Sequence, residues 1–228
     1  MGGLIGAVIA TAGFSGLQSA GIKKIVFGIF FSPIIGFLLG YVIMVIVAWL
    51  FRRVKPRTAK SVFSKLQLLS AGAMSFAHGT GDAQKAMGII AGALVAGGVY
   101  EMQADGGLPI KPWIRILCAV TMACGTAMGG WAVVRTLGTR LANLRPHQGF
   151  SAETAGATTI LINTLTGVPI STTHSITGAV MGVGAAHGMK SVKWTVGKKI
   201  VFAWVVTFPV CIGAGAVLYL LLNFLHIR

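Results

Sequence analysis

The sequence predicts an all-α membrane protein that crosses the bilayer several times, and three observations support this fold class. Hydrophobic residues make up 55% of its 228 residues and charged residues only 10%, whereas soluble domains carry about 25% charged residues. The mean hydropathy is +0.82. The apolar residues also lie in runs of about 20 or more, the length that a transmembrane helix needs. This composition excludes a typical soluble enzyme, a disordered tail and a fibrous protein.

The formal net charge of +15 comes from short basic clusters that separate the apolar runs. Such clusters are typical of cytoplasmic loops in membrane proteins, because Lys and Arg are enriched on that side. The sequence has no stripe of mixed aromatic and basic residues, which is typical of nucleic-acid-binding surfaces. We therefore expect a multi-pass protein of the cell membrane, with the lipid bilayer and not nucleic acid as its surroundings.

The first clear span covers residues 28–51 and leads into a loop, residues 52–65, with six positive residues and no acid. We place this loop in the cytoplasm. Residues 67–100 form a long apolar segment with a polar interruption, and residues 101–107 hold two of the chain's four acids and no basic residue. We place that second loop outside. A third span, residues 113–134, then returns to a basic cluster that begins at Arg135.

Residues 151–187 are predicted to form a re-entrant helical hairpin, because the segment is long for one span and short for two. Its centre contains Pro169, which disfavours a helix just before it. The Ser/Thr run that follows suits the N-cap of a helix. Residues 200–224 form the last clear span.

An internal repeat organises these segments. The sequence Lys-Lys-Ile-Val-Phe occurs at residues 23–27 and again at 198–202, and the Gly-rich residues 2–7 resemble residues 178–183. Three crossings separate the copies if the hairpin does not cross the membrane, and an odd number inverts the second copy, which is typical of secondary transporters with broken helices. We expect an inverted-repeat transporter fold: the tail of a first repeat with one span (1–51), a basic loop (52–65) and a second repeat (66–228). Because Met1 falls inside a repeat, we also expect a fragment or a late start.

The strongest candidate site is the polar interruption of residues 78–85. Asp82 and Lys85 are three residues apart, so they share a helix face and could pair. Charges inside a membrane cost about 2.5–3.5 kcal/mol each on insertion scales, so a functional role is the default. The alternative is a pair that only seats the helix at an interface. We expect the backbone to unwind at Gly79, Thr80 and Gly81, so that its N–H groups face an anion.

The second candidate site is the Ser/Thr run at the hairpin centre. Ser171, Thr172 and Thr173 place hydroxyl groups and free backbone N–H groups at the start of a helix, where an oxyanion could bind. The alternative is ordinary helix capping. His78 and His174 could carry a proton, although a core histidine is an equal reading for His174. Further candidates for the cavity are Gln84, Asn163 and Thr166, whereas Glu153 is assigned to a helix N-terminus.

The sequence contains no catalytic set: it has no nucleophile elbow, no His-Glu-x-x-His and no Walker motif. The three cysteines have no metal-ligand spacing, and we expect neither a metal site nor a cofactor. We therefore predict that the protein is not an enzyme. An intramembrane hydrolase built from Asp82, His78 and Ser171 is a weaker alternative, because only the residue types support it.

At its two candidate sites the sequence resembles the inorganic phosphate transporter (PiT) family. Residues 78–88, His-Gly-Thr-Gly-Asp-Ala-Gln-Lys-Ala-Met-Gly, are similar to that family's Gly-Ala-Asn-Asp signature helix. Residues 169–174, Pro-Ile-Ser-Thr-Thr-His, are similar to its Pro-x-Ser-Thr-Thr-His hairpin tip. The resemblance covers residues 66–228, the second half of such a transporter.

The resemblance implies a secondary permease that moves inorganic phosphate, free or as a metal complex, with a coupling cation. It implies that Asp82 binds the cation or a proton and that the hydroxyls of residues 171–173 face the phosphate. Two departures, Gly81 for an Asn and Lys85 for a later Asn, favour coupling to H⁺ over Na⁺, and the Gln84-Lys85 variant looks like that of proton-linked bacterial members. A sulfate permease, a non-transporting degenerate half-transporter and a homodimer stay open as alternatives.

Overall fold

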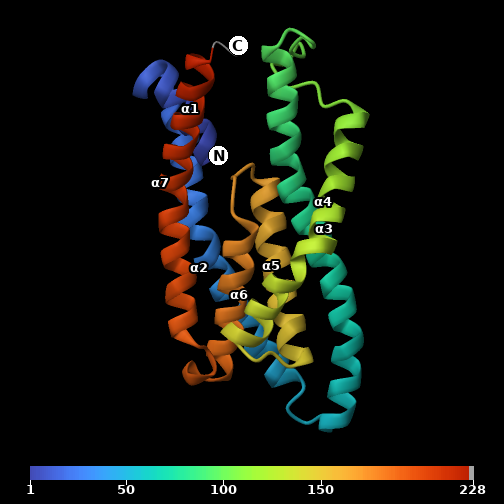
Figure 1. The fold of residues 1–228 in the computed structure, drawn as a ribbon. Coiled ribbons are helices and arrows are strands. Elements are labelled where there is room, and N and C mark those ends of the chain that lie inside the picture. Colours follow the sequence, from blue (N-terminus) through green and yellow to red (C-terminus); the bar gives the residue numbers. More distant parts are fainter. Residues whose placement is uncertain (226–228) are drawn as a thin grey trace. The chain divides into compact units, whose positions relative to one another are not determined.

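The computed structural model describes residues 1–225, and these residues are almost entirely helical (Figure 1). Three helical segments are long and apolar enough to cross a membrane: Ser19–Leu50, Pro112–Leu141 and Trp194–Phe224. The all-α membrane fold class is therefore confirmed. The elements in chain order are α1 (Gly2–Ala12), η1 (Gly13–Gly16), α2 (Ser19–Leu50), α3 (Pro56–Ala96), α4 (Pro112–Arg135), η2 (Thr136–Leu141), α5 (Pro146–Leu165), α6 (Thr172–His187), η3 (Met189–Ser191) and α7 (Trp194–Phe224).

The chain divides into two compact units, and the division falls within α2. The first unit contains Met1–Phe27 and the segment from Lys193 onward, and the second contains Gly28–Val192. In the first unit α1 packs on α7. A Cβ atom at Gly6 would collide with the carbonyl oxygen of Ile212, and one at Gly215 would collide with the carbonyl oxygen of Gly3. Small residues thus let the two helices approach closely, as is usual between helices in membranes.

In the second unit the same kind of contact joins α2 and α6. A Cβ atom at Gly178 would collide with the carbonyl oxygen of Pro33, and one at Gly182 with that of Phe37. In the opposite direction, a Cβ atom at Gly40 would collide with the carbonyl oxygen of Ala179.

The two glycine contacts occupy matching positions in the sequence repeat. Gly6 and Gly182 are equivalent in the two copies, and so are their partners Ile212 and Phe37. Each copy of the short Gly-rich helix therefore packs on the long helix of the other copy. This agreement supports the duplication that the sequence indicates.

Helix α3 contradicts the prediction of an unwound segment at residues 79–81. The helix runs without a break from Pro56 to Ala96, 41 residues, and neither Gly79 nor Gly81 has a positive φ. The backbone N–H groups of residues 79–81 lie inside this helix, where they donate to carbonyl oxygens of the preceding turn. The glycine at 81 instead gives room for packing, because a Cβ atom there would lie 3.3 Å from Cγ2 of Ile160.

Helices α5 and α6 form the predicted helical hairpin and lie side by side (Figure 1). The hairpin begins at Pro146, five residues earlier than the sequence indicates. Its tip turns at Gly167, with φ of 67°, a conformation that favours glycine. At its base Ala142 and Val192 form an isolated antiparallel bridge, so the chain leaves the hairpin at the end where it entered.

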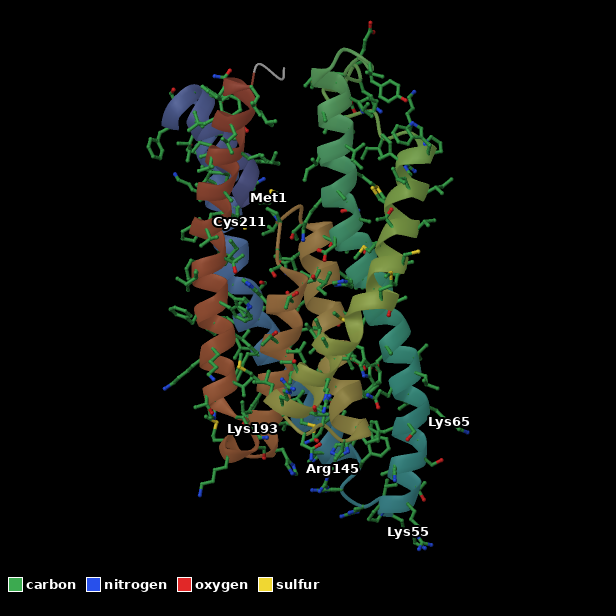
Figure 2. The ribbon with its side chains drawn as sticks, in the orientation of Figure 1. Met1, Lys55, Lys65, Arg145, Lys193 and Cys211 are labelled. Carbon is green, nitrogen blue, oxygen red and sulfur yellow. The ribbon has the colours of Figure 1, made fainter. Side chains whose placement is uncertain are left out.

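Within the second unit, the loops lie at the ends that the charge pattern predicts. Figure 1 shows the α2–α3 and α4–α5 connections at one end and the α3–α4 connection at the other. Lys55 and Arg145 lie at the shared end in Figure 2. The predicted basic loop of residues 52–65 is wrong in its extent, because α3 already begins at Pro56 and most of these residues are helical. The basic segments still lie opposite the loop that carries Glu101 and Asp105, and the assignment of the basic end to the cytoplasm stays a prediction.

Candidate functional site

The polar segment of α3 meets the hairpin tip through Asp82 and Lys85. The Lys85 ammonium donates to Oδ1 of Asp82 at 2.7 Å and to the carbonyl oxygen of Ile170 at 2.7 Å. The hydroxyl of Thr172 donates to the other oxygen of Asp82, Oδ2, at 3.0 Å. Asp82 and Lys85 on α3 therefore bind the hairpin tip, at residues 85 to 90 positions away in the sequence.

The Asp82–Lys85 pair is only partly buried. The side chains of Lys85 and Asp82 are 31% and 33% exposed. His78 joins the cluster from one turn earlier, with Nε2 3.7 Å from Oδ2 of Asp82. The cluster thus combines one carboxylate, one ammonium and one imidazole, and its Lys85 side chain lines a cavity.

The cavity beside this cluster has a volume of about 300 Å³. Its lining combines polar side chains with apolar residues of the hairpin tip: Gly81, Gln84, Lys85, Asn163, Thr164, Gly167, Val168, Pro169, Ile170 and Thr172. Lys85 is the charged side chain in this lining. An ammonium has three N–H donors, and two of those of Lys85 are already used, so one remains for a ligand.

Among the residues singled out from the sequence, the structure brings together Gly81, Gln84, Lys85, Asn163 and Thr172 as lining of the cavity. Asp82 and His78 belong to the hydrogen-bonded cluster at its edge. Gly79 and Thr80 do not line the cavity, and the Thr80 hydroxyl donates to the carbonyl oxygens of Phe76 and Ala77 within its own helix.

The hydroxyl groups of the tip have different partners. The Ser171 side chain accepts a hydrogen bond of 3.3 Å from the backbone N–H of His174, so it caps α6, as the alternative reading of this motif expects. Thr173 is exposed and outside the cavity lining. The Thr166 hydroxyl donates to carbonyl oxygens of α5. Of the predicted hydroxyls, that of Thr172 is the one in contact with both the cavity and Asp82.

His174 lies on a different side of α6 from the cavity. Its ring is buried, 9% exposed, and interacts with the backbone of Ile29 on α2. Nearby, Ser32 is 1% exposed, and its hydroxyl has no hydrogen-bond partner within the described part of the chain. Ser32 lies four residues from both Gly28 and Gly36, which face the hairpin, so it shares that helix face. Nothing in the sequence distinguishes Ser32 from an ordinary serine in a span.

The assignment of Glu153 to a helix N-terminus is wrong. It lies in the third turn of α5, because the helix begins at Pro146, and so it is not a charge at the helix N-terminus. Its Oε2 accepts a hydrogen bond of 2.5 Å from the Ser70 hydroxyl on α3. The sequence separates these residues by 83 positions, and only the packing of α3 on α5 brings them together.

No group of three or more His, Cys, Asp or Glu side chains that could hold a metal occurs within residues 1–225. The architecture defines a helical membrane protein whose polar cluster lies where a long helix meets a hairpin tip. Residues 1–215 match the phosphate transporter family, and the chain belongs to this family. It is a family of transporters and not of enzymes, as the lack of catalytic motifs predicts.

Two bacterial relatives carry the name "Probable low-affinity inorganic phosphate transporter". The protein of Rhizobium meliloti (strain 1021) is 44% identical over 96% of this chain and 64% of its own length. That of Bacillus subtilis (strain 168) is 39% identical over 98% of this chain and 66% of its own length. The chain thus spans somewhat less than two thirds of the length of these relatives.

A solved structure has the same fold. It is titled "The sodium-dependent phosphate transporter" and superposes with a TM-score of 0.87, over 98% of this chain and 72% of the other. The two sequences are 23% identical, so the likeness concerns the fold alone.

Proposed function

We propose that the chain belongs to a secondary permease for inorganic phosphate with an inverted-repeat fold, coupled to protons rather than sodium. The observation that carries the proposal is the Asp82–Lys85–Thr172 cluster beside the cavity at the hairpin tip. The family membership and the names of the relatives support phosphate as the substrate. The matched packing of the two Gly-rich helices supports the inverted repeat.

Phosphate binding is assigned to the groups that converge on the cavity. The remaining N–H of Lys85 and the amide of Gln84 donate to phosphate oxygens. Asn163 donates from Nδ2 to the Thr159 carbonyl oxygen at 2.7 Å. This bond leaves Oδ1 of Asn163 as the acceptor for a protonated phosphate oxygen. A site with both donors and an acceptor favours a monoanion or dianion of phosphate, because these species differ from the fully ionised one by their P–OH groups.

The position of Lys85 supports coupling to protons. Its ammonium is 2.7 Å from Asp82, so a fixed positive charge already occupies the space beside the carboxylate that a sodium ion would need. Two unit charges 4 Å apart at an effective dielectric constant of about 20 interact by roughly 4 kcal/mol, and the one-third exposure of both groups reduces this value. The proton then travels on Asp82, on the neighbouring His78, or on the phosphate itself.

The test is labelled-phosphate uptake by proteoliposomes that contain the full-length protein, at fixed pH with sodium replaced by choline. Uptake is expected to persist in choline and to collapse when a protonophore is added. Loss of uptake in choline would refute proton coupling and leave the phosphate assignment standing. No uptake of phosphate in either salt, with uptake of labelled sulfate instead, would refute the substrate.

A further inference from the structure

A second cavity lies at the base of the hairpin, where α5 begins and α6 ends. Its volume is about 220 Å³. The polar residues of its lining are Asn143, Arg145, Gln148, His187 and Ser191. Helix α5 has 20 residues and is therefore about 30 Å long, so this cavity is separate from the one at the hairpin tip.

The base cavity is cationic. Arg145 and His187 both line it and are exposed to solvent at its rim. His147 is next to these two residues. Burial lowers the pKa of His147, and the charges of Arg145 and His187 lower it further. Because Arg145 and His187 line the same small cavity, both can act on one bound group.

No carboxylate in the described chain neutralises this cluster. Asp82 is at the hairpin tip, and Glu153 is bound to a serine of α3. Glu101 and Asp105 belong to the α3–α4 connection, which lies at the other end of this unit from the base of the hairpin (Figure 1). These are the four acidic residues of the sequence, and Arg145 forms an ion pair with none of them in the described structure.

The inner wall of the cavity adds a buried donor. Gln148 is 4% exposed and lines the cavity. Its Oε1 accepts a hydrogen bond of 2.8 Å from the backbone N–H of Arg145, which fixes the amide and assigns Nε2 as a donor. The amide of a buried glutamine, an arginine and a histidine therefore share one small cavity that no carboxylate lines.

We propose that the cavity at the hairpin base binds a phosphate group, supplied by free inorganic phosphate or by the headgroup of an anionic lipid. The planar guanidinium of Arg145 suits two phosphate oxygens, and the Gln148 amide supplies a third contact. The volume is below the roughly 300–1,000 Å³ of pockets for drug-sized ligands, which fits a single small anion. The positive end of α5 favours an anion, while the nearby end of α6 opposes it, so the side chains provide the selectivity.

The site goes beyond the proposed transport function, because it lies at the opposite end of the hairpin from the transport cavity and uses none of its residues. It joins the start of α5 to the end of α6 beside the Ala142–Val192 bridge. An anion bound here would connect the segment that enters the hairpin to the segment that leaves it.

The experiment measures protection of a thiol at the rim. Ser191→Cys is introduced into the full-length protein with Cys118, Cys124 and Cys211 replaced by serine, and the protein is placed in nanodiscs. Maleimide labelling of the new thiol is timed in two arms. One arm adds inorganic phosphate to phosphatidylcholine nanodiscs, with sodium chloride at equal ionic strength as reference. The other replaces part of the lipid with phosphatidic acid, without added phosphate.

At least one arm is expected to slow labelling. Arg145→Gln should raise the half-protecting concentration about 10- to 100-fold, the range for losing a hydrogen bond to a charged group, and His187→Gln should raise it less. The matched control Arg140→Gln, an exposed arginine outside the cavity, should leave protection unchanged. Lys85→Gln should also leave it unchanged, which separates this site from the transport cavity.

Protection in the first arm identifies free phosphate as the source, and protection in the second identifies the lipid headgroup. Labelling that is equally fast in both arms would overturn the proposal. Protection that survives both Arg145→Gln and His187→Gln would overturn it as well. Gel filtration of each variant establishes that it is folded. If Arg145→Gln does not fold, the test uses His187→Gln alone.

Discussion

Replacing Lys85 by glutamine tests the centre of the proposed transport site. The Lys85 ammonium joins α3 to the hairpin tip through two hydrogen bonds of 2.7 Å, to the Asp82 carboxylate and to the Ile170 carbonyl oxygen. Glutamine keeps a polar side chain but removes the charge and shortens the reach. The change therefore leaves Asp82 with the Thr172 hydroxyl as its remaining close donor.

The size of the effect follows from these two bonds. A hydrogen bond that involves a charged group contributes about 1.5–3 kcal/mol, and solvent screening at 31% and 33% exposure places the Asp82 bond at the low end of that range. If the same ammonium also donates to phosphate, its loss should weaken apparent phosphate affinity about 10- to 100-fold, since each 1.4 kcal/mol corresponds to about tenfold. The carboxylate without its cation should also gain a response to sodium.

The assay is the concentration dependence of labelled-phosphate uptake by proteoliposomes of the full-length protein, in sodium and in choline buffers. Lys65→Gln is the matched control, because Lys65 is an exposed lysine on the same helix with no ion pair in the described residues. A KM and a maximal rate equal to those of the wild type in both buffers would refute the reasoning. They would place the Lys85 ammonium outside both phosphate binding and cation coupling.

Three other predictions concern coupling, topology and packing. Asp82→Asn should abolish uptake while the protein still inserts, because it removes the carboxylate that Lys85 and Thr172 contact; wild-type uptake at equal surface expression would remove Asp82 from the mechanism. Single cysteines in residues 52–65 and in residues 101–107 should react with an impermeant maleimide from opposite sides of the membrane, and labelling of both from one side would contradict the topology. Gly36→Val should lower thermal stability in detergent by about 1–3 kcal/mol or more, the cost of overpacking, because a Cβ there collides with the Ser175 carbonyl oxygen. Gly72→Val, at a position with open space, is its control, and equal melting temperatures for the two variants would show that α2 does not pack on α6 in this way.

The elements of this fold could be predicted from the sequence because their signals are local. Runs of apolar residues define the spans, and the basic and acidic loops define which ends lie together. Pro169 and the serine after it define the start of α6, and Ser171 is indeed its N-cap. The repeated Gly-rich segments also predict close helix contacts, although the repeat does not say which helices are paired.

The candidate site could be predicted only in part. Asp82, Lys85 and the hairpin tip stand out in the sequence as polar groups in apolar segments, which are costly and therefore informative. The sequence overestimates the freedom of Gly79 and Gly81, since glycine permits unwinding but does not require it. Helix α3 stays intact at both glycines. The absence of a side chain at Gly81 makes room for Ile160 to pack there.

The sequence by itself therefore predicted the membrane-helix class, the helical hairpin and the two polar segments of the candidate site, and it indicated a duplication. Only the tertiary structure decided that Thr172 and not Ser171 contacts Asp82, that Lys85 reaches the Ile170 carbonyl oxygen, and that Glu153 pairs with Ser70. It also decided that Arg145 and His187 share a cavity. These contacts depend on which faces of distant segments meet. Residues about 40 to 90 positions apart do not affect each other's local composition or periodicity, because their contact exists only after the helices have packed.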